Sequence, residues 1–299
     1  MYGNRLMHSY KVEAKLGSGS NTAVYKAWHR GLCKHIVIKE LKNGSAKAVE
    51  VQRNELEALK NVKSLYIPQV FDFITEENNS YTVMEYIEGD SFDKLLKYGR
   101  MFSEAQIIKW YYQIACALEA IHKHYICHRD IKPSNIMLMP DGNVCLIDFN
   151  CALVNGNDTK VVNRSTGYAS PEQHMYFQIC DDYNRQRVSF AAEPTQIFKA
   201  ADTDGIKAEM LIRNKYSGYM SAAPIDWKLS DIYSLGATMY HLLTGKRPPV
   251  LADEKTVASN LKENIGEIAS IVKRSMRNNP VKRFSSATEL CKALCSLTW

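Results

Sequence analysis

The fold is decided by residues 127–136, which read Cys-His-Arg-Asp-Ile-Lys-Pro-Ser-Asn-Ile, and by the Asp-Phe-Asn run that begins at Asp148. This stretch supplies one carboxylate suited to accept a proton, one lysine, and two oxygen donors suited to a hard divalent cation. These groups belong to Asp130, Lys132, Asn135 and Asp148. Their close spacing predicts a site that neutralises negative charge and positions a proton acceptor.

Transfer of a phosphoryl group has these requirements, because the protein must mainly align oxygens and neutralise charge. The pattern His-Arg-Asp-x-Lys-Pro-x-x-Asn resembles the catalytic loop of eukaryotic-type protein kinases. Further motifs follow in that family's order, and together they are far more specific than a glycine-rich loop alone. They are the glycine-rich loop at 16–24, the Val-Ala-Ile-Lys-like strand at 36–39, the Ser-Pro-Glu run at 170–172, the segment 231–236, and Arg283.

The resemblance implies a role for each residue of the first stretch. Asp130 is expected to accept or orient the proton of the substrate hydroxyl, and Lys132 to neutralise charge on the transferring phosphate. Asn135 and Asp148 are expected to hold Mg²⁺ or Mn²⁺ that bridges the phosphates. His128 is expected to pack beneath the loop and not to act as the base.

Lys39 lies at the end of an apolar strand, where a buried ammonium would be costly unless it were paired. Helical spacing over residues 46–63 places Glu55 on the apolar stripe of the next element. We therefore expect Glu55 to pair with Lys39. In the family this pair positions the lysine on the α- and β-phosphates of ATP.

The resemblance also implies an ATP pocket. Gly17 and Gly19 would let the backbone approach the phosphates. The side chains of Leu16, Val24 and Met137 would close over the adenine. Met84 would gate the pocket, and the backbone groups of Glu85 and Ile87 would read the adenine edge.

A lysine two residues after the catalytic aspartate is typical of serine/threonine kinases, so protein serine and threonine hydroxyls are the expected acceptors. Two alternatives stay open. One is a nucleotide-binding pseudokinase scaffold, because Asn150 replaces a family glycine and the chain carries an insertion. The other is a small-molecule kinase of related fold, a class that usually lacks the Ser-Pro-Glu run at 170–172.

The chain departs from the family at several positions. Asn150 is expected to adopt a left-handed backbone at a cost that glycine would not have. Arg164 replaces a glycine before Ser165, whose hydroxyl is expected to contact Asp130 and Lys132. Residues 176–222 are expected to form an insertion that governs substrate choice or self-association.

Two further expectations come from the family. Arg129 precedes the catalytic aspartate, and such an arginine often receives a phosphate from the activation segment. Thr159 is the first candidate for autophosphorylation, ahead of Ser165 and Thr166. Glu172 and Arg283 are expected to form a structural ion pair.

The expected fold is α+β and two-lobed. Residues 1–85 should form an antiparallel sheet with one helix over 46–63, with strands at 69–74 and 80–86. Residues 86–299 should be mostly helical, with a capping box at Ser103 and further helices at 230–244, 265–277 and 286–297. The last of these helices should begin with a second capping box, from Ser286 to Glu289. The turn Asp141-Gly142 should join two short strands.

The composition is that of an ordinary globular chain of 299 residues. Its 38 basic and 32 acidic residues give a net charge of +6 without a basic run, so no nucleic-acid partner is expected. No apolar run suits a membrane span or a signal core, and short motifs resemble bacterial members of the family, so a cytoplasmic bacterial signalling enzyme is expected. The oligomeric state is not predicted.

The chain has eight cysteines, and none forms a Cys-x-x-Cys pair. Cys116, Cys127, Cys145 and Cys295 fall in apolar stretches, which favours buried free thiols. Cys145 and Cys151 flank the Asp-Phe-Asn run, and a redox-sensitive thiol there is an open alternative.

Overall fold

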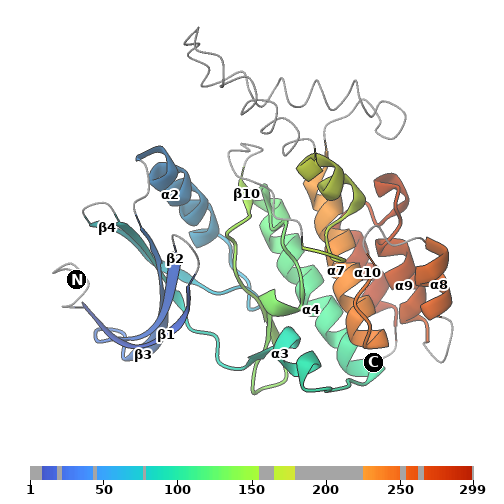
Figure 1. Cartoon of the computed structure of the whole chain (residues 1–299), viewed down its shortest axis with the longest axis horizontal. Helices are drawn as coiled ribbons and strands as arrows, with labels where there is room; N and C mark the ends of the chain where they lie inside the picture. Colours follow the sequence, from blue (N-terminus) through green and yellow to red (C-terminus); the bar gives the residue numbers. More distant parts are fainter. Residues whose placement is uncertain are drawn as a thin grey trace, which may run out of the picture.

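The computed structural model describes residues 9–18, 22–42, 46–76, 79–154, 165–178, 225–249, 254–261 and 266–297. Figure 1 shows a sheet with α2 on one side of the molecule and most of the helices on the other. The predicted α+β, two-lobed fold is confirmed.

The N-terminal part is a five-stranded antiparallel sheet with the strand order β1-β2-β3-β5-β4. Its strands are β1 (Tyr10–Ser18), β2 (Thr22–His29), β3 (Lys34–Leu41), β4 (Val70–Glu76) and β5 (Asn79–Glu85), and its helix is α2 (Ala46–Lys60). The side chains of Ile36, Ile38 and Val83 are buried at the centre of its core. This sheet places Lys39 on a central strand, and the predicted helix over 46–63 ends at Lys60.

The C-terminal part is built around two long helices, α4 (Glu104–Lys123) and α7 (Trp227–Thr244). The shorter helices are α3 (Phe92–Lys97), a helix over 171–178, α8 (Glu254–Asn260), α9 (Ile268–Ser275) and α10 (Ala287–Cys295). Short strands and turns lie beside them: β6 (Asp90–Ser91), β7 (Ile126–Cys127), η1 (Pro133–Asn135), β8 (Ile136–Leu138), β9 (Val144–Leu146), β10 (Leu153–Val154) and η2 (Pro280–Lys282). The catalytic-loop motif therefore connects β7 to β8, directly after α4.

Local sequence signals explain where the long helices begin and end. Ser103 and Gln106 form the predicted reciprocal capping box of α4, and Ile107, Trp110, Ile114 and Leu118 are buried along its inner face. Gly245 ends α7 in the left-handed conformation with φ of 65°. These signals set the ends of the two long helices, and the catalytic loop is held between these helices.

The N-terminus of α10 differs from the prediction in one detail. Ser286 accepts a hydrogen bond from the backbone N–H of Glu289, as expected. The Glu289 carboxylate, however, accepts from the backbone N–H and hydroxyl of Ser285 and not from Ser286. The reciprocal half of the capping box is thus displaced by one residue.

Other boundaries also need correction. The helices α3, α8 and the one over 171–178 were not predicted, because each is short and its apolar spacing is weak over so few residues. Residues 176–178, placed in the insertion by the sequence pattern, continue the helix over 171–178. The rest of the predicted insertion lies outside the described residues.

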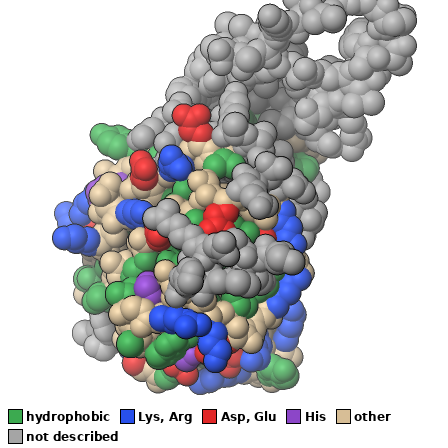
Figure 2. Space-filling view, turned by 90° about the vertical axis from the view of Figure 1, so that its left-hand side faces the viewer, with side chains coloured by type: hydrophobic (Ala, Val, Ile, Leu, Met, Phe, Trp, Pro, Cys, Tyr) green, Lys and Arg blue, Asp and Glu red, His purple; other side chains and the backbone are tan. Residues whose placement is uncertain are grey.

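Figure 2 looks onto the side of the molecule that carries the sheet. Lysine and arginine side chains lie at several separate places on this face, among acidic, hydrophobic and uncharged side chains. On the face in view, the basic side chains of the described residues therefore do not gather into one patch.

Candidate active site

The Asp130 carboxylate lies at the centre of a compact polar group. Ser165 donates a hydrogen bond of 2.6 Å to Oδ1, and the Lys132 ammonium lies 2.8 Å from Oδ2. Asn135 donates from Nδ2 to Oδ2 at 3.1 Å and to the Asp130 carbonyl at 2.8 Å. Lys132 also donates to the Ser165 hydroxyl at 3.1 Å, so the expected contacts of Ser165 with both residues are present.

A carboxylate of α7 holds the loop that carries Asp130. The backbone N–H groups of His128 and Arg129 each donate to the Asp231 carboxylate at 2.8 Å. His128 is fully buried, and its Nε2 lies 3.1 Å from the Ile147 carbonyl. His128 thus connects the loop to the strand that leads to Asp148, and its buried position agrees with a packing role.

Asp148 and Lys39 join the two parts of the molecule. The Lys39 ammonium lies 3.1 Å from Asp148 Oδ1, and both side chains are partly exposed. Burial, the largest single effect, opposes ionisation of Asp148, but the charge and hydrogen bond of Lys39, together with smaller effects of His128 and Lys132, hold the pKa of the carboxyl below its ordinary value. Glu55 lies in α2, but its side chain is outside the described part of the structure, so the expected pair of Lys39 with Glu55 stays a prediction.

The prediction that Asn150 adopts a left-handed backbone is wrong. Among the described non-glycine residues, positive φ occurs at Cys33, Tyr125, Arg129 and Asp148, with φ of 67° at Asp148, and Asn150 is not one of them. Aspartate tolerates this region better than most residues with a side chain. The conformational cost in the Asp-Phe-Asn run therefore falls on Asp148, two residues before the position where the family glycine is replaced.

Asn135 and Asp148 supply oxygen donors of the kind that Mg²⁺ and Mn²⁺ prefer. Asn135 directs its Nδ2 toward Asp130, which leaves Oδ1 with a weak contact of 3.3 Å from the Ser134 hydroxyl. The lowered pKa of Asp148 keeps its carboxylate ionised at neutral pH. The chemistry of this donor pair fits a divalent cation.

The predicted nucleotide residues lie on the sheet and on the segment that follows it. Leu16 is exposed on β1, Val24 is half-buried on β2, and Met84 is half-buried at the end of β5. A Cβ at Gly17 would meet no described atom within 4 Å, so packing among the described residues does not require glycine there. Gly19 lies outside the described residues.

The remaining nucleotide positions follow β5. The backbone N–H of Glu85 donates to the Gln69 carbonyl at 2.9 Å, and Ile87 lies in the irregular segment between β5 and β6. Met137 is half-buried on β8, where it pairs with Cys145 of β9.

Glu172 and Arg283 form the predicted ion pair. The Arg283 guanidinium donates to both Glu172 oxygens, at 2.6 and 2.9 Å, and both residues are buried. Arg283 also donates to the Leu229 carbonyl at the start of α7. The pair thus anchors the Ser-Pro-Glu segment to the helical core.

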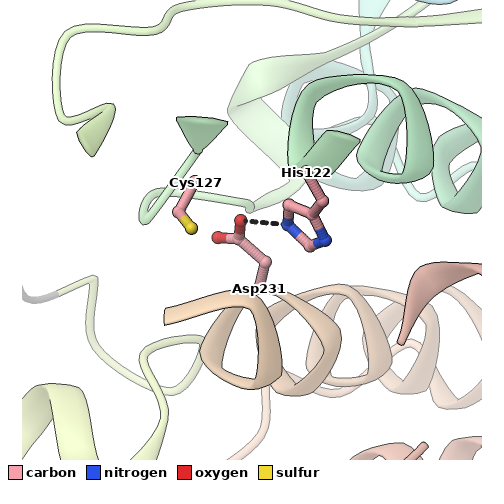
Figure 3. Close-up of side chains that lie close together, drawn as sticks. All are labelled: His122, Cys127 and Asp231. Carbon is pink, nitrogen blue, oxygen red and sulfur yellow. Dashed lines mark hydrogen bonds and ion pairs between the residues drawn. The ribbon is translucent and has the colours of Figure 1, made fainter. Parts of the chain in front are cut away.

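Figure 3 shows His122 of α4, Cys127 of β7 and Asp231 of α7 close together. Their ligand atoms lie within 4.8 Å of one another, a spacing that a metal ion could bridge. Asp231 Oδ2, however, already lies 2.9 Å from His122 Nε2 and accepts from the backbone of His128. Burial, and then the negative Asp231, raise the pKa of the Cys127 thiol, so it stays protonated. The cluster is therefore better explained as support for the loop.

Some positioning residues were missed from the sequence. Asp231 was recognised only as the first residue of a family motif, although it accepts hydrogen bonds from two N–H groups of the catalytic loop. Gln173 donates from Nε2 to the Arg129 carbonyl at 2.7 Å. His122 lies on α4, and only the fold brings it to α7. Its position on the inner face of the helix was the one available signal.

The predicted positions Thr159 and Arg164 lie outside the described residues. The described cysteines are all free, and Cys116 is half-buried while Cys127, Cys145, Cys151 and Cys291 are buried. Cys33 and Cys295 are exposed, so the expectation of a buried thiol is wrong for Cys295. Burial, followed by the negative Glu85, raises the pKa of Cys145, which argues against a redox-sensitive thiol at that position.

Comparison with known proteins identifies the family. The model of the protein kinase domain matches residues 10–182, which is more than half of the chain. The chain belongs to the protein kinase family, as the sequence motifs predicted.

Two bacterial relatives align with nearly the whole chain. A protein named "Probable serine/threonine-protein kinase" from Clostridium acetobutylicum is 28% identical over 99% of this chain and 41% of its own length. One with the same description from Clostridium perfringens is 26% identical over 97% of this chain and 38% of its own length. Mouse serine/threonine-protein kinase Nek1 is 36% identical over 56% of this chain and 14% of its own length. The chain thus spans less than half the length of these relatives.

Within the described residues, no helix combines the length and apolar character needed to cross a membrane.

Proposed function

We propose that this chain is a serine/threonine protein kinase that transfers the γ-phosphate of ATP to protein hydroxyls with Mg²⁺ or Mn²⁺. The observation that carries the proposal is the hydrogen bond of 2.6 Å from the Ser165 hydroxyl to Asp130 Oδ1. It supports the proposal because a hydroxyl group lies within hydrogen-bonding distance of the proposed base. Family membership and the names of the relatives support the same activity.

Each residue around Asp130 has a task in this mechanism. Asp130 would accept or orient the proton of the acceptor hydroxyl, in the place that Ser165 takes here. Lys132, which is 2.8 Å from Asp130, would neutralise charge on the phosphoryl group during transfer. Asn135 would orient Asp130 through Nδ2 and leave Oδ1 for the cation.

Lys39 and Asp148 would hold the phosphates of ATP in place. A bound cation would neutralise negative charge on the phosphates of ATP. Asp148 would hold that cation, and its low pKa keeps the carboxylate available at neutral pH. Lys39 would bind the α- and β-phosphates, and Glu55 would orient Lys39. Gly17, Gly19, Leu16, Val24, Met84, Glu85, Ile87 and Met137 would surround the nucleotide.

The acceptor class follows from Lys132 and from the Ser-Pro-Glu segment. A kinase for small molecules does not need an anchored peptide-binding segment, whereas the buried pair of Glu172 with Arg283 holds residues 170–172 in place. Protein substrates are therefore the better match. A cytoplasmic location stays a prediction from the sequence.

The test is a peptide library with serine, threonine or tyrosine as the acceptor, incubated with γ-labelled ATP and either Mg²⁺ or Mn²⁺. We expect label on the serine and threonine peptides and none after chelation with EDTA. Label on tyrosine peptides alone would overturn the acceptor class. Metal-independent transfer would overturn the roles of Asn135 and Asp148.

A further inference from the structure

Three cysteines meet where α10 packs against α4, away from the proposed active site. Cys116 of α4 and Cys291 of α10 lie with their sulfur atoms 3.8 Å apart. Cys295 follows one turn later on α10 and hydrogen-bonds with Tyr112 of α4. A disulfide has a sulfur–sulfur bond of about 2.0 Å, so an approach of about 2 Å would join the first two thiols.

The two thiols differ in the way that an attacking and a resolving cysteine should differ. Cys116 is half-buried and within reach of solvent, whereas Cys291 is buried with 8% of its surface exposed. The Cys291 thiol and then the Tyr112 hydroxyl hydrogen-bond with Cys116, and together they lower the Cys116 pKa to about 7 against the opposing effects of burial and Glu119. The same contact, together with burial, raises the pKa of Cys291. Cys116 is therefore the more accessible of the two thiols and the one that ionises more readily.

We propose that Cys116 and Cys291 form a peroxide-responsive dithiol that closes to a disulfide between α4 and α10. The Cys116 thiolate attacks a hydroperoxide, so that an S–O bond forms, the O–O bond breaks and hydroxide or alkoxide leaves. The Cys291 sulfur then attacks the Cys116 sulfur, which forms the S–S bond and breaks the S–O bond. The Cys291 proton leaves with the hydroxide as water. The two sulfurs lose two electrons, and the peroxide gains them.

The bridge would constrain the fold because it closes a long loop. Cys116 and Cys291 are 175 positions apart, and the chain between them includes the catalytic loop and α7. Closing so long a loop restricts the unfolded chain strongly. The oxidised protein should therefore unfold about 5 to 10 °C higher than the reduced protein, and a thiol reductant should reverse the shift.

The experiment treats the reduced, folded chain with hydrogen peroxide, blocks the remaining thiols with N-ethylmaleimide and maps the peptides by mass spectrometry. We expect one cross-linked peptide pair that joins Cys116 to Cys291. It should be absent from Cys116→Ser and from Cys291→Ser. It should persist in Cys295→Ser and in the matched exposed control Cys33→Ser. If a variant does not fold, the peptide map of the unmutated protein decides the outcome alone.

Several results would overturn the proposal. One is a bridge to Cys295 in place of Cys291, and another is a bridge that forms only in denaturant. Oxidation of Cys116 to sulfinic acid without any bridge, or no change in either thiol, would equally contradict it. Because none of these measurements uses ATP, they are independent of the proposed kinase activity.

Discussion

The ammonium nitrogen of Lys39 lies 3.1 Å from Oδ1 of Asp148, although 109 positions separate the two residues in the sequence. This contact connects the central strand β3 to the Asp-Phe-Asn run that follows β9. It places a positive charge and an ionised carboxylate next to each other, as binding of phosphate and its counter-cation requires.

Asp130→Asn should lower turnover by ~10² to 10⁴-fold, the range expected for loss of a positioned acid–base group. Asparagine preserves the shape of the side chain but cannot accept the proton as carboxylate does. The measurement is steady-state phosphorylation of a serine peptide, with Asp141→Asn in the exposed turn after β8 as the matched control. Equal turnover in Asp130→Asn and the parent would exclude Asp130 as the base.

Arg283→Met should destabilise the fold by about 3 to 5 kcal/mol, because it leaves the buried Glu172 carboxylate without its partner. Urea denaturation measures the change. Lys97→Met is the control, since its pair with Asp93 is on the surface and should contribute less than about 1 kcal/mol. A similarly small loss in Arg283→Met would show that Glu172 finds other partners or becomes protonated.

Asn150→Gly should leave turnover and its magnesium dependence nearly unchanged. Asn150 does not have positive φ, so glycine relieves no backbone strain there. A magnesium titration of activity in both proteins is the measurement. An increase of several-fold in the glycine variant would indicate that the active conformation needs a left-handed backbone at residue 150, as the sequence alone suggested.

His241 should make the fold sensitive to mild acid. Burial, followed by the positive Arg247, lowers the pKa of His241 from its ordinary 6.5, while Nδ1 lies 2.7 Å from the Tyr168 hydroxyl. The unfolded chain therefore binds a proton near pH 6.5 that the folded chain does not bind. The His241 contribution to stability is complete above pH 6.5 and is lost as the pH falls from there through the folded pKa.

Denaturation measured between about pH 7.5 and 5 should show this loss in the parent and a flatter profile in His241→Asn. His124→Asn, at an exposed histidine, should keep the parent profile. The glutamates with lowered pKa, Glu119, Glu254 and Glu289, titrate below their ordinary value of 4.5, and Asp141 and Asp148 below their ordinary 3.8, so these carboxyls affect stability in a lower pH range. An unchanged slope in His241→Asn would assign the acid sensitivity to another group.

The sequence predicted those parts of the site that short motifs specify. Asp130, Lys132 and Asn135 are so close in the chain that one loop must bring them together, and the structure does so. The pair Glu172 with Arg283 was predictable only by resemblance, because nothing local joins residues 111 positions apart.

Other features depend on the fold as a whole and could not be read from local patterns. The turn around Asp148 sets the backbone angle at residue 150. The packing of β3 against the C-terminal part brings Lys39 into contact with Asp148. The thiol pair Cys116 with Cys291 arises where α4 meets α10, and neither helix shows it alone. Leu16, Gly17, Val24, Met84 and Glu85 lie on the five-stranded sheet, and contact of any predicted pocket residue with a nucleotide stays a prediction.

The most direct test of the central claim is transfer of labelled γ-phosphate from ATP to a serine or threonine peptide by the parent and by Asp148→Ala, in the presence of Mg²⁺. The account predicts transfer by the parent and a loss of at least about 10²-fold in Asp148→Ala, because the cation loses its carboxylate ligand. Fluorescent ATP binding without metal should persist in both proteins and serves as the control for folding. Equal transfer by the two proteins, or no transfer by the parent with either Mg²⁺ or Mn²⁺, would contradict the account.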